Sequence, residues 1–463
     1  MCGILFTSQS NDIDDNIITP LKQRGPDATT SISLYGYTFV HTLLSMSQHY
    51  RLQPIIHDDI VILFNGEIYN YKQFGDEILC DTDAIITAYR IHGMHFAKYL
   101  DGEFAIIIYD HNIRKLFIST DIFGTKPLWA DFTNLGACSY FSPLDKLQHH
   151  NIIQCEPNTT YIYDITYRSL TKLRIYNFDL RQYKTDYNDW INAFDAAITK
   201  RATNTKHNIF IGLSSGYDSG AIMTALLKQH REFAAYTILG SENHDIIQQR
   251  AKLLKTHNIY DIDEREYIDI VNEIKQYENY NMVIDNVSKP LYHDNGAIGL
   301  ASICKRARAN NQIIYLSGSG ADEIYSDYGY NKVKHYRHST LGGYYPTDLS
   351  KVFPWRNFYM NTQRAYLMKD EYIGGYYGIE ARYPFLDKYV VQEFLNLHES
   401  LKNREYKAPI YYYLIDSDTP IDNDRKIGFN CGYRYNADTN TVTKHIATRT
   451  HIGITTDPSL ITS

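Results

Sequence analysis

Residues 209–219 of this chain read IFIGLSSGYDS and lead into an apolar stretch that ends at Lys228. The run Ile209–Leu213 is short and apolar, which is typical of a buried β-strand. The Ser/Gly turn after it is typical of a loop, and Gly220–Lys228 has the composition of a helix. A strand that enters a tight glycine turn and then a helix is the repeating unit of a parallel, doubly wound α/β domain.

The same pattern recurs further along the chain. Ile313–Leu316 is a second short apolar run, and it enters the turn Ser317-Gly318-Ser319-Gly320. Upstream, apolar residues recur at helical spacing between Asp189 and Arg201. We therefore predict an α/β domain over residues 187–435, preceded by a polar connector at 171–186 and followed by a polar tail at 436–463.

Residues 1–170 show a different pattern and predict a separate domain. Short apolar runs typical of strands occur at Ile60–Phe64, Phe104–Tyr109, Leu116–Ser119 and Tyr161–Tyr163. An apolar face at helical spacing predicts a helix at Asp81–Ile91. The first domain therefore combines sheet and helix.

Length, composition and charge restrict the class of protein. A chain of 463 residues corresponds to about two to four domains, and 44% apolar with 21% charged residues is a normal globular balance. The net charge of −7 argues against nucleic acid as the main partner. Six cysteines without a CxxC pair favour a reducing compartment. The start of the chain lacks leading basic residues, and no apolar run approaches the roughly 20 residues of a membrane span, so we expect a cytoplasmic protein without a membrane partner.

The turn Ser214–Ser219 has the chemistry of a phosphate site. Backbone N–H groups of a turn that opens a helix form a cradle for a pyrophosphate, and the serine hydroxyls add donors. Asp218 can hold Mg²⁺, which binds phosphates through few carboxylates. The turn is not a Walker A loop, because no Gly-Lys-Ser/Thr ends it. Taken alone, it is also compatible with an ordinary strand–helix loop.

Cys2 is a candidate nucleophile because of its position. Removal of Met1 would leave a thiol and a free α-amine on one residue, and an α-amine with a reference pKa of about 8 can act as a base near neutral pH. A thioester-forming nucleophile also needs hydrogen-bond donors for the developing oxyanion. The side-chain amide of Asn65 and the backbone N–H of Gly66 could supply them. The alternatives are an accidental cysteine near a terminus and a simple Asn-Gly hairpin turn.

The first half of the chain resembles the class II glutamine amidotransferase domain of asparagine synthetases. The matching segments follow the order of that family: Cys2-Gly3-Ile4, Arg24–Asp27, Asn65–Asn70, Asp101–Asp110, and Asp121 with Phe123–Leu128. The resemblance implies an Ntn-hydrolase-like αββα sandwich in which Cys2 attacks the glutamine amide and Asn65 and Gly66 form the oxyanion hole. It also implies that Glu67 lines the glutamine pocket and that Asp81 holds the amino group of glutamine.

The second half resembles the ATP-pyrophosphatase (PP-loop) domain of the same family. Ser214–Ser219 matches the first signature, with Ser215 in place of a glycine, and Leu316–Glu323 matches the second. The resemblance implies contacts for ATP and pyrophosphate at Leu213, Ser214, Gly216, Asp218, Ser219, Ile238, Ser317, Gly318, Asp322 and Lys407. It implies Mg²⁺ ligands at Asp218 and Asp322, and a catalytic Lys426 that steadies the departing pyrophosphate. It further implies an acceptor pocket made of Ser319, Glu380, Arg382 and Asp387.

Two positions depart from the family pattern. Leu43 stands where the family has an arginine that pairs with the glutamine carboxylate. We predict that Arg51 replaces it, because a guanidinium is the natural partner of a carboxylate. Ser319 stands where the family commonly has a glutamate beside the reactive acyl group. A serine hydroxyl hardly ionises near pH 7, so it is no comparable base.

The resemblance implies a glutamine-hydrolysing asparagine synthetase with ATP and Mg²⁺ as cofactors. Such an enzyme converts aspartate, glutamine and ATP to asparagine, glutamate, AMP and pyrophosphate through a β-aspartyl-adenylate. The alternatives are the same machinery acting on another carboxylate, an ammonia-dependent synthetase with an impaired glutaminase, and a non-catalytic relative. The expected partners are small-molecule substrates, with no nucleic acid and no membrane, and the chain is compatible with a homodimer.

Overall fold

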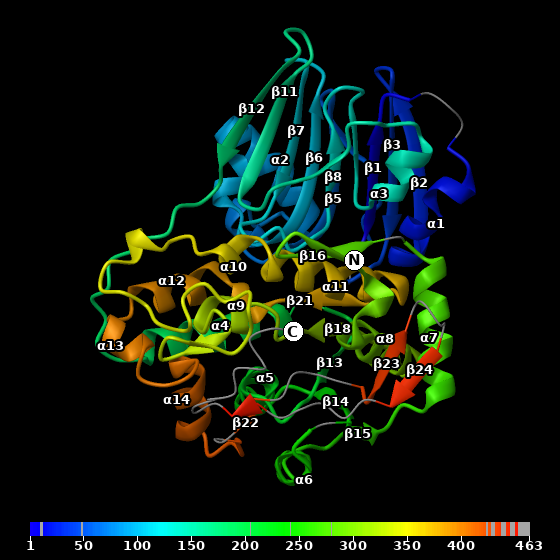
Figure 1. Ribbon diagram of the computed structural model, residues 1–463. Helices are drawn as coiled ribbons and strands as arrows, with labels where there is room; N and C mark the ends of the chain where they lie inside the picture. The colour runs from blue at the N-terminus through cyan, green and yellow to red at the C-terminus, as the bar shows by residue number, and fades with distance from the viewer. Residues whose placement is uncertain are drawn as a thin grey trace.

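Two domains stack on one another in the computed structural model of the protein, with the sandwich of the first domain above the second (Figure 1). The structure describes residues 1–9, 13–47, 50–203, 205–240, 242–278, 280–422, 425–426, 431–436, 441–444 and 450–451. Within these ranges no helix is long and apolar enough to cross a membrane.

The first domain contains two six-stranded sheets whose neighbouring strands are antiparallel. One sheet has the order β10-β8-β9-β1-β3-β2, and its strands are β1 Gly3–Thr7, β2 Ala28–Leu34, β3 Tyr37–Leu43, β8 Trp129–Asp131, β9 Gly136–Cys138 and β10 Ile153–Gln154. The other has the order β12-β11-β7-β6-β5-β4, and its strands are β4 Ile55–His57, β5 Ile60–Ile68, β6 Gly102–Asp110, β7 Lys115–Thr120, β11 Thr159–Asp164 and β12 Ser169–Arg174.

Alternating apolar side chains explain why the two sheets pack face to face. In β5, Val61 and Leu63 join Ile4 and Phe6 of β1 in one buried cluster between the sheets. Residues of opposite parity in β5, such as Ile62, join the second cluster, which includes residues of helix α2 (Asp81–His92). Because side chains alternate across a strand, each central strand serves two apolar layers. With α1 (Asp15–Arg24) and α3 (Phe141–Lys146) on the first sheet, the predicted αββα sandwich is confirmed.

The second domain is built on a five-stranded sheet with the order β15-β14-β13-β18-β21, and every neighbouring pair is parallel. Its strands are β13 Asn208–Gly212, β14 Phe233–Ile238, β15 His257–Tyr260, β18 Gln312–Leu316 and β21 Glu380–Arg382. Its larger helices are α4 Asn188–Ala202, α5 Tyr217–Lys228, α6 His244–Ala251, α7 Glu264–Gln276, α8 Asn295–Ala309, α11 Thr362–Tyr376, α12 Lys388–Asn396 and α14 Ala408–Asp416. The predicted doubly wound parallel domain is thus confirmed.

Several short elements complete this domain. They are the helices α9 Ala321–Tyr325, α10 Arg356–Tyr359 and α13 Glu399–Lys402, and the paired strands β16 Asn281–Ile284 with β17 Val287–Pro290 and β19 Gly329–Tyr330 with β20 Val333–Lys334. Near the C-terminus, β22 Arg425–Lys426 pairs with β25 Thr450–His451, and β23 Tyr433–Asn436 pairs with β24 Thr441–Lys444.

The chain order of the parallel strands places a ligand site. From β13 the chain runs outward to β14 and β15, and it then returns to β18 and β21 on the other side of β13. The strand order therefore reverses between β13 and β18. In open α/β sheets, ligands bind outside the carboxyl ends of the strands at such a switch point. The loops after β13 and β18 are the two serine- and glycine-rich turns identified in the sequence.

Three segments differ from the sequence expectation. Asn65 and Gly66 lie inside β5 and pair with β6, so the hairpin-turn alternative is wrong. Helix α5 begins at Tyr217, which puts Asp218 into its first turn. Residues 171–174 of the predicted connector form the second half of β12. The domain boundaries remain predictions, and most of the predicted tail lies outside the described residues.

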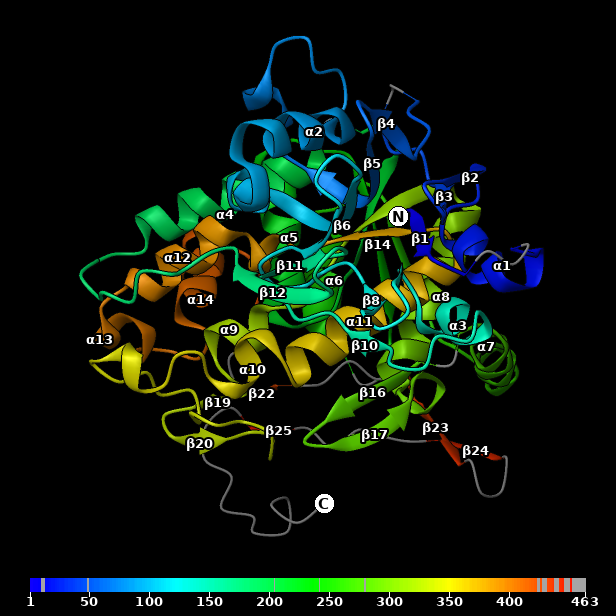
Figure 2. The same ribbon diagram turned by 90° about the horizontal axis from the view of Figure 1, so that it is seen from above.

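The two domains share a hydrophobic core. One buried cluster joins Met1, Leu5 and Leu21 of the sandwich with residues such as Tyr372 and Ile379 of the second domain. Helix α11, gold in both views, runs beneath the sandwich and contacts α1 (Figures 1 and 2). The N-terminus lies at this junction, so the start of the chain is a contact between domains (Figure 1).

Candidate active sites

Cys2 lies immediately before β1, at the junction of the two domains. Its backbone N–H donates to Asn65 Oδ1 at 3.0 Å, and its carbonyl accepts from Arg24 Nε at 2.8 Å. The Sγ atom lies 3.9 Å from the carbonyl oxygen of Leu44. Burial raises the pKa of the Cys2 thiol to about 11. The thiol is therefore neutral near pH 7 in this form of the chain.

Met1 is still attached to Cys2, so the α-amine of the chain belongs to Met1 and not to Cys2. Its ammonium is buried and lies 3.2 Å from Glu380 Oε2, and burial lowers the pKa of this ammonium. With Met1 attached, the nitrogen of Cys2 is a peptide N–H and cannot act as a base. The predicted N-terminal base thus requires removal of Met1, which remains a prediction.

Asn65 and Gly66, the predicted oxyanion hole, adjoin one another in β5. Asn65 is fully buried, and its Nδ2 has no hydrogen-bond partner within the described part of the chain. A buried amide donor without a partner is costly, which favours a ligand as the acceptor. Gly66 has a φ of +142°, and a Cβ there would lie 1.9 Å from the carbonyl oxygen of Glu103. No other residue fits at Gly66 without moving β6.

Glu67 and Asp81, the predicted glutamine-binding residues, both lie close to Gly66 and Ile68 of β5. Glu67 follows Gly66 in β5 and lies 3.2 Å from Arg382 Nη2. Asp81 opens α2, and its Oδ2 accepts from the N–H of Ile68 at 3.1 Å. Burial raises the pKa of Asp81 to about 7 and the pKa of Glu67 well above its usual range.

Two cations, Arg51 and Lys206, are the candidates to replace the arginine that is missing at Leu43. Leu43 itself is buried at the end of β3. The half-exposed Arg51 pairs with Asp83 at 2.9 Å, on the first turn of the helix that carries Asp81. Lys206 Nζ, from the second domain, donates to Ser45 Oγ at 2.8 Å. The sequence carries no signal for Lys206, because its contact with Ser45 depends on how the domains dock.

The loop after β13 is held rigidly from behind. Ser214 Oγ accepts from the N–H of Gly216 at 3.1 Å and lies 2.8 Å from Ser219 Oγ. Arg250 donates to the carbonyls of Ser214 and Gly216. The N–H groups of Ser214, Ser215 and Gly216 also donate within the protein, so the donors for an anion would come from the N-terminus of α5.

Ser215, the residue in place of a glycine, is accommodated without strain. Its φ is not positive, and its N–H and hydroxyl both donate to Oε2 of the buried Glu242 at 2.6 Å. Leu213 and Ile238 are buried at the ends of the neighbouring strands β13 and β14. The substitution in the first signature is therefore compatible with the turn.

Asp218 and Asp322 converge on Lys407. Lys407 Nζ lies 2.7 Å from Asp218 Oδ2 and 3.0 Å from Asp322 Oδ1. Burial alone would lower the pKa of Lys407, but the two carboxylates outweigh it and raise this pKa. Among the described residues, no group of three or more His, Cys, Asp or Glu side chains could hold a metal ion. Two carboxylates nevertheless suit Mg²⁺, which keeps several waters and takes phosphate oxygens as further ligands.

The loop after β18 approaches the same place. A Cβ on Gly318 would lie 3.1 Å from Asp218 Cβ, so the two loops touch. Ser317 Oγ and Ser319 Oγ donate to Asp370 Oδ2 of α11 at 2.6 and 2.8 Å. Sequence reasoning missed Asp370, because no motif connects it with this loop. Lys426 lies in β22, but its side chain falls outside the described residues.

Three residues of the predicted acceptor pocket are engaged in ion pairs near the domain junction, and their assignment to the pocket stays a prediction. Glu380 accepts from Arg382 Nε at 2.7 Å and holds the Met1 ammonium, while Arg382 also lies beside Glu67. Asp387 Oδ2 accepts from Arg201 Nη1 at 2.9 Å. These side chains therefore face the first domain. Of the predicted pocket, Ser319 stays at the nucleotide edge.

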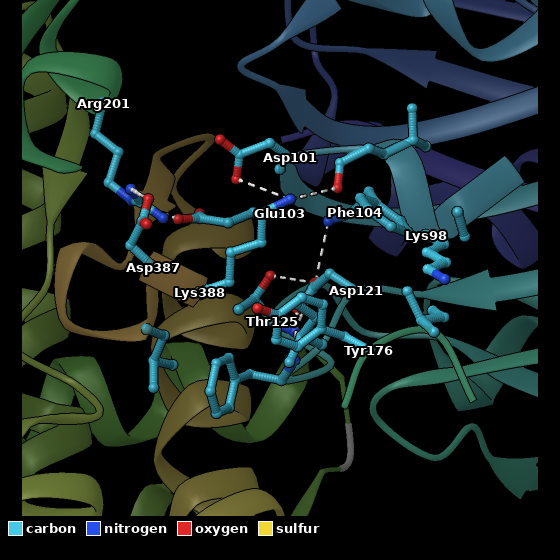
Figure 3. A pocket seen from close by; sticks show the side chains of 17 residues that line it. Lys98, Asp101, Glu103, Phe104, Asp121, Thr125, Tyr176, Arg201, Asp387 and Lys388 are labelled. Carbon is cyan, nitrogen blue, oxygen red and sulfur yellow. Dashed lines mark hydrogen bonds and ion pairs between the residues drawn. The ribbon is translucent and has the colours of Figure 1, made fainter. Parts of the chain in front are cut away.

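A buried charge network connects the domains around these residues. Arg201 Nε donates to Glu103 at 2.7 Å, and Lys126 Nζ donates to Glu371 at 2.9 Å. Figure 3 shows the cavity in this network, where the side chains of Glu103, Asp121, Arg201 and Asp387 from both domains come together. Its volume of about 20 Å³ suits roughly one water molecule, not a substrate.

Comparison with known proteins agrees with this two-site arrangement. Residues 1–179 match the family model "Glutamine amidotransferase domain", and residues 190–375 match "Asparagine synthase". The chain is 27% identical to asparagine synthetase [glutamine-hydrolyzing] of Gallus gallus over 461 residues, covering 87% of this chain and 78% of that protein. It is 25% identical to a putative asparagine synthetase of Methanocaldococcus jannaschii, covering 80% and 72%. It is 24% identical to a probable asparagine synthetase of Acanthamoeba polyphaga mimivirus, covering 87% and 79%.

Proposed function

Because the chain belongs to the family of glutamine-hydrolysing asparagine synthetases, we propose that it makes asparagine from aspartate, glutamine and ATP through a β-aspartyl-adenylate. The observation that carries this proposal is the meeting of Asp218, Asp322 and Lys407 at the switch point of the parallel sheet. A second site around Cys2 lies in the other domain of the same rigid junction.

The first half-reaction releases ammonia from glutamine. In the chain that begins at Cys2, the α-amine takes the thiol proton, and the thiolate attacks the amide carbon of glutamine. Asn65 Nδ2 and the N–H of Gly66 donate to the oxyanion. Asp81 holds the ammonium of the substrate and Glu67 lines the pocket. The α-ammonium returns the thiol proton to the nitrogen of the amide as the C–N bond breaks, so that ammonia leaves, and water then hydrolyses the thioester to glutamate.

The second half-reaction activates the acceptor. A carboxylate oxygen of aspartate attacks the α-phosphorus of ATP, and pyrophosphate leaves. The N-terminus of α5, which begins at Tyr217, and the ammonium of Lys407 bind the departing pyrophosphate. The predicted role of Lys426 is to stabilise the same leaving group. Mg²⁺ would be held by Asp218 and Asp322, and when bound it neutralises phosphate charge. Ammonia then displaces AMP from the acyl group to give the amide.

A second candidate function is the same chemistry on another carboxylate. It is favoured by one observation: Glu380 and Arg382 pair with Met1 and Glu67 of the first domain, and Asp387 pairs with Arg201, so all three already have charged partners. A screen of other amino acid and peptide carboxylates would identify such an acceptor.

The test is pyrophosphate release from Mg-ATP with and without aspartate, using ammonium as the nitrogen source. Ammonium removes the glutaminase from the assay, so only the second domain is measured. We expect release that requires aspartate and yields asparagine and AMP in equal amounts. If pyrophosphate release does not depend on aspartate but requires another carboxylate, that carboxylate is the acceptor and the proposal of aspartate is wrong.

A further inference from the structure

Asp370 is a buried carboxylate at the nucleotide edge with no cationic partner within ion-pair distance in the described part of the chain. It projects from α11, and only 3% of it is exposed. By contrast, Asp218 and Asp322 at the same edge are both paired with Lys407. Removing a carboxylate from water without pairing it is costly, so such a group is retained for a reason other than stability.

The hydrogen bonds of Asp370 leave one oxygen available. The hydroxyls of Ser317 and Ser319 both donate to Oδ2, at 2.6 and 2.8 Å. Among the described residues, Oδ1 receives no hydrogen bond. Two donors on Oδ2 fix the orientation of the carboxylate against the loop. Oδ1 can therefore accept a proton or a further donor without breaking these bonds.

Asp370 lies close to the residues that are predicted to bind ATP and Mg²⁺. Ser317 and Ser319 flank Gly318, where an added Cβ would lie 3.1 Å from Asp218 Cβ. The loop that orients Asp370 is thus the loop that touches the predicted Mg²⁺ ligand. An acyl-adenylate formed at this switch point would lie between the two loops.

We propose that Asp370 accepts the proton that ammonia loses when it attacks the acyl-adenylate, an inference that rests on the proposed function. The nitrogen of ammonia forms a C–N bond to the acyl carbon, and the C–O bond to AMP breaks, with AMP taking the electron pair. One N–H proton passes to Oδ1 of Asp370 and later to water. The products are the neutral amide, AMP and an unchanged Asp370 carboxylate.

The surroundings of Asp370 suit this role. Burial raises the pKa of Asp370, which brings it closer to the working pH and makes it a better proton acceptor than an ordinary aspartate. The titratable and charged groups that face it come from its own helix, from α8, from β18 and from the segment after β21. They are Lys369, Glu371, Cys304, Tyr315 and Tyr383. Of these, Lys369 is the one cation.

The test separates adenylation from amide formation in the full-length protein. Asp370→Asn would be compared with the wild type in aspartate-dependent exchange of labelled pyrophosphate into ATP, and in asparagine formation from ammonium. We expect exchange to change by less than about threefold and asparagine formation to fall about 100-fold or more, since a positioned acid–base group contributes about 10²–10⁴-fold. Asp370→Glu should recover part of the rate.

A pH profile distinguishes proton transfer from a structural role. In the wild type, amide formation should decrease as the pH falls through the pKa of Asp370, and D370N should lack this decrease. Asp327→Asn is the matched control, because Asp327 is also buried, accepts from hydroxyl and backbone donors, and has a pKa raised by burial. D327N should keep both the ratio of the two rates and the pH profile.

The outcomes are distinct. Absence of aspartate-dependent exchange in the wild type would overturn the proposed function and this inference with it. An active wild type with D370N losing both rates equally would overturn the inference alone and assign Asp370 to acceptor binding or folding. Unchanged rates in D370N would also overturn it. A selective loss of amide formation with a flattened pH profile supports the proposal.

Discussion

Leu43 and Ser319 are the two departures from the family pattern, and the structure treats them differently. Around Ser319, a buried carboxylate from α11 contacts the altered side chain directly. Around Leu43, the cations Arg51 and Lys206 are bound to Asp83 and Ser45. A rigid helix beside a core loop can present a new charge at a fixed place. Near Leu43, by contrast, the two cations are long side chains whose partners lie outside β3.

The largest expected effect separates the two sites. Cys2→Ala should lower glutamine-dependent synthesis about a thousandfold or more, because removal of a nucleophile removes the covalent route. Synthesis from ammonium should stay within about twofold of the wild type. Parallel assays with both nitrogen sources would check this. Equal loss with ammonium would mean that the two sites do not function independently.

The next largest effect is a loss of stability when the buried charge network between the two domains is broken. Glu371→Gln leaves Arg24 and Lys126 buried without their shared carboxylate, which should cost about 3–5 kcal/mol of the free energy of unfolding. Denaturant unfolding would measure it. The control is Glu156→Gln, which breaks an exposed pair with Lys172 and should cost less than about 1 kcal/mol. Similar values for both variants would show that the buried network does not stabilise the domain contact.

The replacement for the missing arginine beside Leu43 can be identified by two substitutions. Arg51→Ala should raise the KM for glutamine about tenfold or more if Arg51 binds its carboxylate, since a charged hydrogen bond contributes about 1.5–3 kcal/mol. Lys206→Ala tests the cation from the second domain in the same assay. The control is Lys22→Ala, which breaks an exposed pair with Asp15. An unchanged KM in both R51A and K206A would leave Leu43 uncompensated and favour an ammonia-dependent enzyme.

The smallest effect is a pH dependence of glutamine binding. Asp81 must be ionised to hold the ammonium of glutamine, and burial raises its pKa to about 7. The ionised fraction falls as the pH drops, so KM should rise about tenfold from pH 8 to pH 6. Asp81→Asn should remove this trend and raise KM at every pH. A KM that does not vary with pH in the wild type would exclude Asp81 as the titrating group.

Local patterns predicted the elements and most of the chemistry. The strand at Ile60–Phe64 and the helix at Asp81–Ile91 were found in β5 and α2, because apolar periodicity reflects which face of an element is buried. The position of Cys2 next to Met1 predicted a nucleophile, and the short serine- and glycine-rich turns predicted phosphate-binding loops after β13 and β18. These signals lie within a few residues, where backbone geometry and hydrogen bonding determine the residue types.

Docking of the domains decided the rest. Glu380 and Arg382 are two residues apart in β21 and must share a face of the strand, but the sequence cannot say which face. The structure turns them toward Met1 and Glu67 of the first domain.

By itself, the sequence determined an α/β chain with two kinds of domain, and it predicted a nucleophile at Cys2 and a phosphate loop at Ser214–Ser219. Only the tertiary structure decided that Lys407 joins Asp218 and Asp322, and that Asp370 meets Ser317 and Ser319. The physical reason is that charge pairing depends on distance in space. Side chains from separate helices and loops carry no shared period or motif, so their meeting is set by the packing of the elements that hold them.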